Sequence, residues 1–195
     1  MATSEQTNAV GSSSRYSGVK PRTIEVALGL FTEYGVDGTT LQMIADELGV
    51  TKAAVYHQFR TKDEIVLAGA EASLARLEVV LDGADDAADP LDHLLSGLID
   101  LSIDQRRMIN LLQNDPVMSR LLGQHERYGQ LTQRLFRGLT QNLSRGDSRV
   151  PVAIVMAAIG GAVTSPLLDE GDHDELRRGL LDLARRLLGP DELRS

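Results

Sequence analysis

The sequence predicts an all-α protein. Apolar residues recur at intervals of three and four along most of the chain, whereas no segment shows the strict alternation of a β-strand. The six prolines lie mostly at expected helix edges, so they interrupt few helix interiors. We expect about nine helices, arranged as an N-terminal three-helix unit and a longer C-terminal helical domain.

The first helix is expected to follow an N-terminal arm. Residues 1–18 lack a basic segment followed by an apolar one, so we expect a disordered arm rather than a signal peptide. Pro21 can open the helix, and Gly35 and Gly38 are expected to end it. Its buried stripe is Ile24, Ala27, Leu28 and Phe31.

Residues 39–62 predict a helix-turn-helix. Thr39 and Gln42 form an expected capping box at the start of the first helix, and Gly49 can end that helix in a left-handed conformation. Thr51 can cap a second helix from Lys52 to Phe59. Its expected buried residues are Ala54, Val55 and Phe59. Its expected outward residues are Lys52, Ala53, Tyr56, His57 and Gln58. The second helix of such a pair fits the major groove of DNA.

The remaining elements are marked by caps and apolar stripes. Thr61 and Glu64 predict a long helix to about Leu81, followed by a loop over 82–89. Asp89-Pro90 and Asp115-Pro116 each place a cap before a proline at the first helical position. The further helices are expected over 91–114, 116–122, a stretch from about Tyr128 to Leu143, 150–163 and 173–188.

The last two expected helices suggest a dimer interface. Residues 150–163 carry no charge and are too short to span a bilayer, which needs about 20 residues. Close approach of a second helix would explain Gly160 and Gly161. The last helix has a narrow apolar seam. Ordinary core is the alternative to a four-helix dimer interface. The expected interface residues are Val155, Ile159, Val163, Leu176, Leu180, Leu183 and Leu187.

The charge is unevenly distributed. Residues 1–62 hold six positive and six negative groups, so the remaining residues supply the whole net charge of −8. Salt screens distant acidic groups beyond about 8–10 Å, so local geometry decides whether the N-terminal part can meet DNA. The absence of cysteine fits the cytoplasm and excludes disulfides and thiolate chemistry.

The block from Lys20 to about Leu81 resembles the N-terminal domain of TetR-type transcriptional regulators. The matching segments read TIEVALGLFTEYGVDGTT, IADELGV and TKAAVYHQFRTKDEIV. One departure is Gln58, where the family most often has His, so the family's base preference does not transfer. The resemblance implies an N-terminal DNA-binding domain and dimerisation through the last two helices.

We expect DNA contacts from both helices of the motif. Lys52 and Lys62 lie at helix N-termini, where amides also attract phosphate. Ala53 can approach a thymine methyl group, and Gln58 can donate to phosphate or read adenine. Thr23 resembles a family phosphate contact. The full expected set is Thr23, Thr40, Gln42, Thr51, Lys52, Ala53, Tyr56, His57, Gln58 and Lys62. Arg15, Lys20 and Arg22 could form a minor-groove arm or be free tail charge.

The C-terminal helices are expected to hold an effector. The candidate contacts are Leu98, Leu101, Met108, Leu112, Met118, Leu121, Tyr128, Leu131, Leu135 and Met156, although aliphatic residues at helical spacing are more often core. The scarcity of aromatic residues favours an aliphatic or acyl-like effector. We expect no metal or cofactor, because the histidines are widely separated, and no enzyme activity, because no phosphate loop or serine elbow occurs.

These observations lead to one interpretation. Residues 19–62 are expected to be a helix-turn-helix DNA-binding domain, and residues 63–195 an effector-binding and dimerisation domain. The chain would be a cytoplasmic homodimeric repressor that a small molecule releases from a double-stranded DNA operator. The alternative is a DNA-binding adaptor that responds to a protein partner and has no small-molecule pocket.

Overall fold

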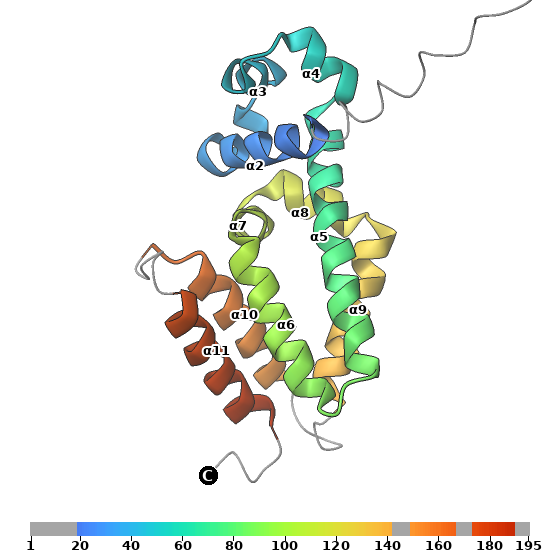
Figure 1. The fold of residues 1–195 in the computed structure, drawn as a ribbon, viewed down its shortest axis with the longest axis vertical. Helices are drawn as coiled ribbons and strands as arrows, with labels where there is room; N and C mark the ends of the chain where they lie inside the picture. Colours follow the sequence, from blue (N-terminus) through green and yellow to red (C-terminus); the bar gives the residue numbers. More distant parts are fainter. Residues whose placement is uncertain (1–18, 142–148, 167–172, 190–195) are drawn as a thin grey trace, which may run out of the picture. The chain divides into compact units, whose positions relative to one another are not determined.

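The all-α fold class is confirmed. A computed structural model of the chain describes residues 19–141, 149–166 and 173–189. Within these residues it contains ten helices and no strand (Figure 1). The expected arm at 1–18, together with Leu143, lies outside the described residues. Contacts divide the chain into two units, Met1–Gly69 and Ala70–Ser195.

Unit 1 is built from three helices and the start of a fourth. These are α2 (Val19–Gly38), α3 (Leu41–Leu48), α4 (Lys52–Gln58) and the first residues of α5 (Lys62–Asp85). Their apolar stripes meet in one small core, as the helical spacing predicted. The core residues with the least exposed surface are Ala27, Phe31, Val36, Ile44, Ala45, Val55, Ile65 and Val66.

The junction between α2 and α3 differs from the expected capping box. Gly35 leaves the helical conformation with φ 74°, a value that favours glycine. The fully buried Thr39 donates its hydroxyl to the Gly35 carbonyl oxygen at 2.8 Å, so it closes α2. Thr40 is the cap of α3 and accepts from the Met43 amide at 3.1 Å. The sequence prediction was therefore wrong by one residue, because Thr39 is needed at the end of the preceding helix.

The start of α5 confirms Thr61 as the expected cap, but the Glu64 carboxylate bonds the amide before Thr61 rather than that of Thr61 itself, which a capping box would require. The Thr61 hydroxyl accepts from the Glu64 amide at 3.1 Å, and the Glu64 carboxylate accepts from the Arg60 amide at 2.7 Å. The helix then runs to Asp85, which is past the predicted end at Leu81. Part of the expected loop at 82–89 is therefore helical.

Unit 2 contains the rest of α5 and six further helices. They are α6 (Pro90–Asp104), α7 (Arg106–Asn114), α8 (Pro116–Gly123), α9 (Glu126–Thr140), α10 (Val150–Val163) and α11 (His173–Leu188). The carboxylates of Asp89 and Asp115 cap α6 and α8 as predicted. The expected single helix over 91–114 is wrong, because the backbone leaves the helical conformation at Gln105. This break accounts for the additional helix.

The core of unit 2 lies between α5, α6, α9, α10 and α11. Leu95, Ile99, Leu139, Val152 and Leu188 are buried at its centre. In the described ranges, no helix has both the length and the apolar character needed to cross a membrane.

Two glycines mark places where helices of unit 2 lie very close. A Cβ added at Gly160 of α10 would lie 2.1 Å from Nε2 of Gln113, so a flexible side chain of α7 fills the space beside this glycine. A Cβ added at Gly97 of α6 would lie 2.5 Å from Cγ1 of Val80 on α5. Since valine is branched at Cβ, it has little freedom to move away.

We predict that Gly97→Ala lowers the free energy of unfolding by about 1–3 kcal/mol, because the added methyl group overpacks the contact with Val80. Gly129→Ala in α9 is the matched control. Nothing lies within 4 Å of a Cβ at that position, so alanine should stabilise the helix by up to about 1 kcal/mol. Urea unfolding of both variants measures the difference. Equal stabilities would contradict the close approach at Gly97.

Candidate nucleic-acid interface

The recognition helix α4 is held at its start by local backbone geometry. Gly49 adopts the left-handed conformation with φ 67°. The amide of Val50 donates to Ala45 and that of Gly49 donates to Asp46, which is the Schellman arrangement that ends α3. The Thr51 hydroxyl then accepts from the Ala54 amide at 3.2 Å and caps α4. Both features follow the sequence prediction.

Two apolar side chains anchor α4 to unit 1. Val55 has no exposed surface and Phe59, which follows the helix, is 6% exposed. The opposite face carries Lys52, Ala53, Tyr56 and His57, which are all exposed as predicted. The predicted burial of Ala54 is wrong. With Val55 and Phe59 four residues apart on one stripe, a neighbour of Val55 is rotated about 100° away from that stripe.

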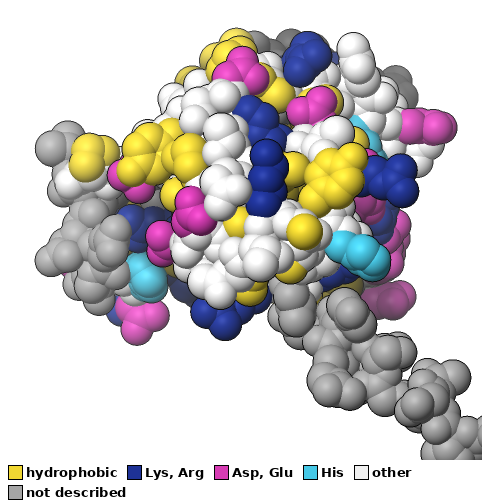
Figure 2. Space-filling model, turned by 90° about the horizontal axis from the view of Figure 1, so that it is seen from above, with side chains coloured by type: hydrophobic (Ala, Val, Ile, Leu, Met, Phe, Trp, Pro, Cys, Tyr) yellow, Lys and Arg dark blue, Asp and Glu magenta, His cyan; other side chains and the backbone are white. Residues whose placement is uncertain are grey.

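The outward face mixes charges rather than presenting a uniformly basic patch. Figure 2 shows Lys and Arg side chains interspersed with hydrophobic and histidine side chains, and with acidic groups among them. This agrees with the balance of charges in residues 1–62. Specific exposed residues, rather than a strong overall field, would therefore have to make contact with DNA.

The position of Thr23 contradicts the role that the sequence predicted for it. It was expected to contact phosphate, but it is fully buried on α2. Its hydroxyl donates to Oε1 of Gln58 at 3.1 Å, and Nε2 of Gln58 donates to the Ala54 carbonyl at 3.3 Å. Gln58 is half-buried and is engaged at both ends of its amide, so its expected outward orientation is also wrong.

The two lysines that were predicted to bind phosphate differ in their surroundings. Lys52 is exposed at the first turn of α4. The Lys62 ammonium instead donates to the carbonyl oxygens of Val36 at 2.6 Å and Asp37 at 3.0 Å. It therefore caps the end of α2, where a cation also interacts favourably with the helix dipole. The expectation that Lys62 is a free phosphate ligand is wrong for this conformation.

The polar residues beside α4 have mixed availability. Thr40 and Thr51 are exposed, and each oxygen accepts from a capped helix while its hydroxyl hydrogen can still point outwards. Gln42 is exposed, but its amide donates to Asp46 at 2.7 Å. A phosphate contact by Gln42 would have to replace that bond. Contact by these three residues stays a prediction.

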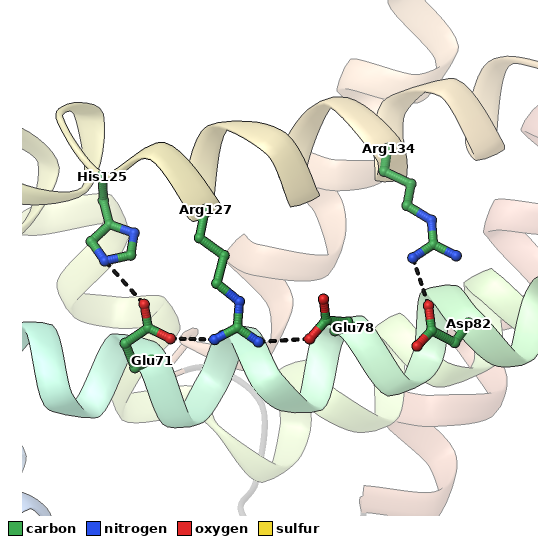
Figure 3. A network of polar contacts seen from close by, with 6 residues as sticks. All are labelled: Glu71, Glu78, Asp82, His125, Arg127 and Arg134. Atoms are coloured by element: carbon green, nitrogen blue, oxygen red, sulfur yellow. Dashed lines mark hydrogen bonds and ion pairs between the residues drawn. The ribbon is translucent and has the colours of Figure 1, made fainter.

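In unit 2, a ladder of ion pairs joins α5 to α9 (Figure 3). Arg127 pairs with Glu71 and, at 2.6 Å, with Glu78. Arg134 pairs with Asp82 and Asp85, each at 2.6 Å. The hydrogen bonds that the Arg127 guanidinium donates, first to Glu78 and then to Glu71, raise its pKa. The spacing of seven between the arginines and the matching stripe of acids on α5 was a sequence signal that the prediction missed.

The ladder also includes a histidine. Nε2 of His125 lies 3.1 Å from Glu71, while Nδ1 accepts from the Tyr128 amide at 3.4 Å. The two contacts fit an imidazole with its hydrogen on Nε2. Neither this histidine nor any other described residue belongs to a group of three His, Cys, Asp or Glu side chains that could hold a metal ion.

The predicted effector contacts are mostly core in this conformation. Leu98, Met108, Met118, Leu131 and Leu135 are buried. Leu101, Leu112, Leu121, Tyr128 and Met156 are partly buried. An effector contact at these positions stays a prediction.

Two hollows in unit 2 touch none of those ten residues. One, of about 210 Å³, lies between α5, α6 and α9 and is lined by both apolar and polar side chains, among them Leu81, Leu94, Asp85 and Arg134. The other, of about 400 Å³, is lined mainly by α9 and includes Phe136, Arg137 and Arg149.

The predicted dimer face is corrected in detail. Val155, Ile159, Val163 and Leu180 are buried inside the subunit, so they cannot meet a partner in this conformation. Leu176 and Leu187 pack partly against the same core. Only Leu183 of the expected set is clearly exposed, at 41%. The exposed apolar stripe that the sequence missed consists of Val150, Ala153, Ile154, Ala157 and Gly161 on α10.

Comparisons with known proteins agree with this geometry. Residues 24–68 match the family model described as bacterial regulatory proteins, tetR family. The chain is 27% identical over 172 residues to the transcriptional repressor AcnR of Corynebacterium diphtheriae, covering 82% of this chain and 86% of that protein. It is 47% identical over 58 residues to the class A tetracycline repressor protein from transposon 1721 of Escherichia coli, covering 29% of this chain and 27% of that protein.

The fold extends the similarity over the whole chain. A crystal structure of a TetR-family member from Streptomyces coelicolor A3 superposes with a TM-score of 0.66 at 21% identity, covering 97% of this chain and 94% of that one. The family match lies on the helices that form and support the exposed face of α4. The chain is therefore similar to DNA-binding transcriptional regulators of the TetR family, through the family model over residues 24–68 and through its fold.

Proposed function

We propose that the chain is a homodimeric repressor in the cytoplasm that leaves its operator when a small molecule binds unit 2. The observation that carries the proposal is the face of α4, where Lys52, Ala53, Ala54, Tyr56 and His57 are all exposed above two buried anchors. An exposed face on the second helix of a helix-turn-helix is the surface that enters the major groove of DNA in such motifs. Repression is supported by AcnR, which is named as a repressor.

The residues of α4 divide between positioning and reading. Lys52 is proposed to neutralise a phosphate at the helix N-terminus, where free amides also attract anions. Tyr56 and His57 would donate to phosphates or base edges, and the methyl groups of Ala53 and Ala54 would allow close approach to thymine. Thr40, Thr51 and Gln42 would add backbone contacts from the neighbouring turns.

The exposed faces of α10 and α11 support a homodimer. The stripe on α10 continues onto α11 through Gly179 and Leu183, because the two helices pack against each other. A Cβ added at Gly161 or Gly179 would meet nothing within 4 Å, so both positions are open to an approaching helix. A twofold dimer would present its recognition helices to half-sites about one helical turn apart, or a multiple of that.

The effector is proposed to act through α5, since this helix contributes residues to both units. The hollow between α5, α6 and α9 is lined by apolar side chains together with Asp85 and Arg134, so a ligand there would combine an aliphatic part with a polar group. Binding there would compete with the ion pairs between Arg134 and α5. The ligand must bind the two conformers unequally, and a coupling of about 1–3 kcal/mol would change DNA affinity 5- to 150-fold.

The test is selection of genomic DNA followed by release. Purified chain should enrich a small set of duplex fragments with twofold symmetry, and a panel of aliphatic and acyl compounds should include one that lowers affinity for them. Anisotropy of a labelled fragment measures both steps. No enrichment would refute DNA recognition. Enrichment that no small molecule reverses would favour the adaptor alternative, which the repressor relatives and the hollow do not favour.

We predict that Lys52→Ala weakens binding to the selected duplex and to unrelated DNA alike. The slope of log affinity against log salt should become shallower by about one unit per bound subunit, since each phosphate contact contributes ~0.9. Lys62→Ala is the matched control. It should leave the slope unchanged and lower the unfolding free energy, because its ammonium holds carbonyl oxygens at the end of α2. Equal slope changes in both variants would contradict this assignment.

We predict that Leu183→Glu or Ile154→Glu yields monomers and abolishes operator binding, because a carboxylate would be buried in an apolar interface. Val79→Glu on α5 is the control, as this valine is 71% exposed and lies outside the proposed face. Light scattering gives the oligomeric state. If both Leu183→Glu and Ile154→Glu remain dimeric, the interface lies elsewhere.

A further inference from the structure

Both polar atoms of the Gln58 side chain make a hydrogen bond within unit 1. Its Oε1 accepts from the Thr23 hydroxyl at 3.1 Å, and its Nε2 donates to the Ala54 carbonyl at 3.3 Å. Thr23 has no exposed surface. Swinging Gln58 outwards would break a hydrogen bond to this buried side chain, which costs more than losing a bond between two exposed groups.

A second contact joins the same two places. The Lys20 ammonium lies 5.9 Å from the centre of the Phe59 ring, within the range of a cation–π interaction. Both contacts link the first turns of α2 to the end of α4. The start of α4 is fixed separately by Thr51 and by the turn at Gly49. The seven-residue helix is therefore held at both ends.

We propose that Gln58 is a positioning residue that sets the orientation of α4 through Thr23, and that it does not read a base. A glutamine that reads adenine needs Oε1 and Nε2 together, in a bidentate pair. Here each of these atoms already makes one hydrogen bond within unit 1, so a bidentate pair with adenine would have to use the second lone pair and the second N–H of the same held amide. The inference rests on the proposed function, in which α4 enters the major groove.

The test is a double-mutant cycle on the duplex that the wild-type chain selects from genomic DNA. Thr23→Val and Gln58→Leu each remove the hydrogen bond with little change of shape, and each should lower affinity for that duplex about 3- to 10-fold. The double variant should lose no more than either single variant, because both remove the same contact. Thr23→Ser keeps the hydroxyl and should restore affinity relative to Thr23→Val.

A second readout separates positioning from base reading and from a purely structural role. Each variant is measured on duplexes in which every base pair of the selected site is substituted in turn, and on unrelated DNA. The order of preference among the substituted duplexes should stay as in the wild type, while the ratio of selected to unrelated affinity falls. A residue that only stabilised the fold would shift thermal unfolding and leave this ratio unchanged.

Three outcomes would overturn the inference. Gln58→Leu could relax the preference at one base pair that Thr23→Val leaves intact. The losses of affinity in the two single variants could instead add up in the double variant. The ratio of affinity for selected DNA to affinity for unrelated DNA could also stay as in the wild type. If Thr23→Val does not fold, the base profile of Gln58→Leu alone decides between the two roles. A wild-type chain that enriches no duplex would overturn the proposed function and this inference together, whereas a changed base profile would overturn only the inference.

Discussion

The exposed face of α4 depends on the burial of two side chains beneath this very short helix. An isolated helix of fewer than about 12 residues is marginal in water, so α4 cannot exist without support from the rest of unit 1. Val55 and Phe59 provide that support, and because they lie four residues apart they fix which face is hidden. The exposure of Tyr56 and His57 is a direct consequence. The same constraint explains why the end of α4 needs further ties to α2.

Charge pairing explains how a chain with an excess of acidic groups can still present the exposed face of α4 to DNA, as proposed. The excess of acidic groups lies after residue 62, where arginines of α9 and α11 meet carboxylates of α5 and α6. Arg177, for example, holds Asp100 through two hydrogen bonds, which raise the pKa of its guanidinium. The electric field of paired, exposed charges is weak beyond the Debye length. The contacts of unit 1 therefore depend on its own charges, whose positive and negative groups are balanced over residues 1–62.

Local signals in the sequence were sufficient to predict much of the fold and most of the exposed residues of α4. Caps such as Thr51, Asp89 and Asp115 have a fixed geometry that the next residues must follow, so the helix starts were predictable. Failures occurred where a residue had a choice of partners. Thr39 could cap either of two helices, and Lys62 could bind phosphate or the end of α2.

The interfaces were less predictable for a different reason. A helix that is apolar on every side, such as α10, offers two equivalent stripes, and periodicity alone does not show which one faces its own core. Ile159 and Ile154 are chemically the same, yet one is buried and the other is half-exposed. The effector contacts stay a prediction for a similar reason, because the side chains that fill a core are of the same types as those that line a pocket.

The distribution of lysine has a practical consequence. All three lysines of the chain lie in unit 1, and every cation of unit 2 other than histidine is an arginine, whose guanidinium stays protonated and unreactive towards amine reagents near neutral pH. Apart from the amino terminus, acylating reagents therefore label only the DNA-binding part. Lys52 stands free, whereas the amine of Lys62 is held by carbonyl oxygens. The extent of acylation at Lys52 would therefore report whether a bound partner, such as the proposed DNA operator, covers the start of α4.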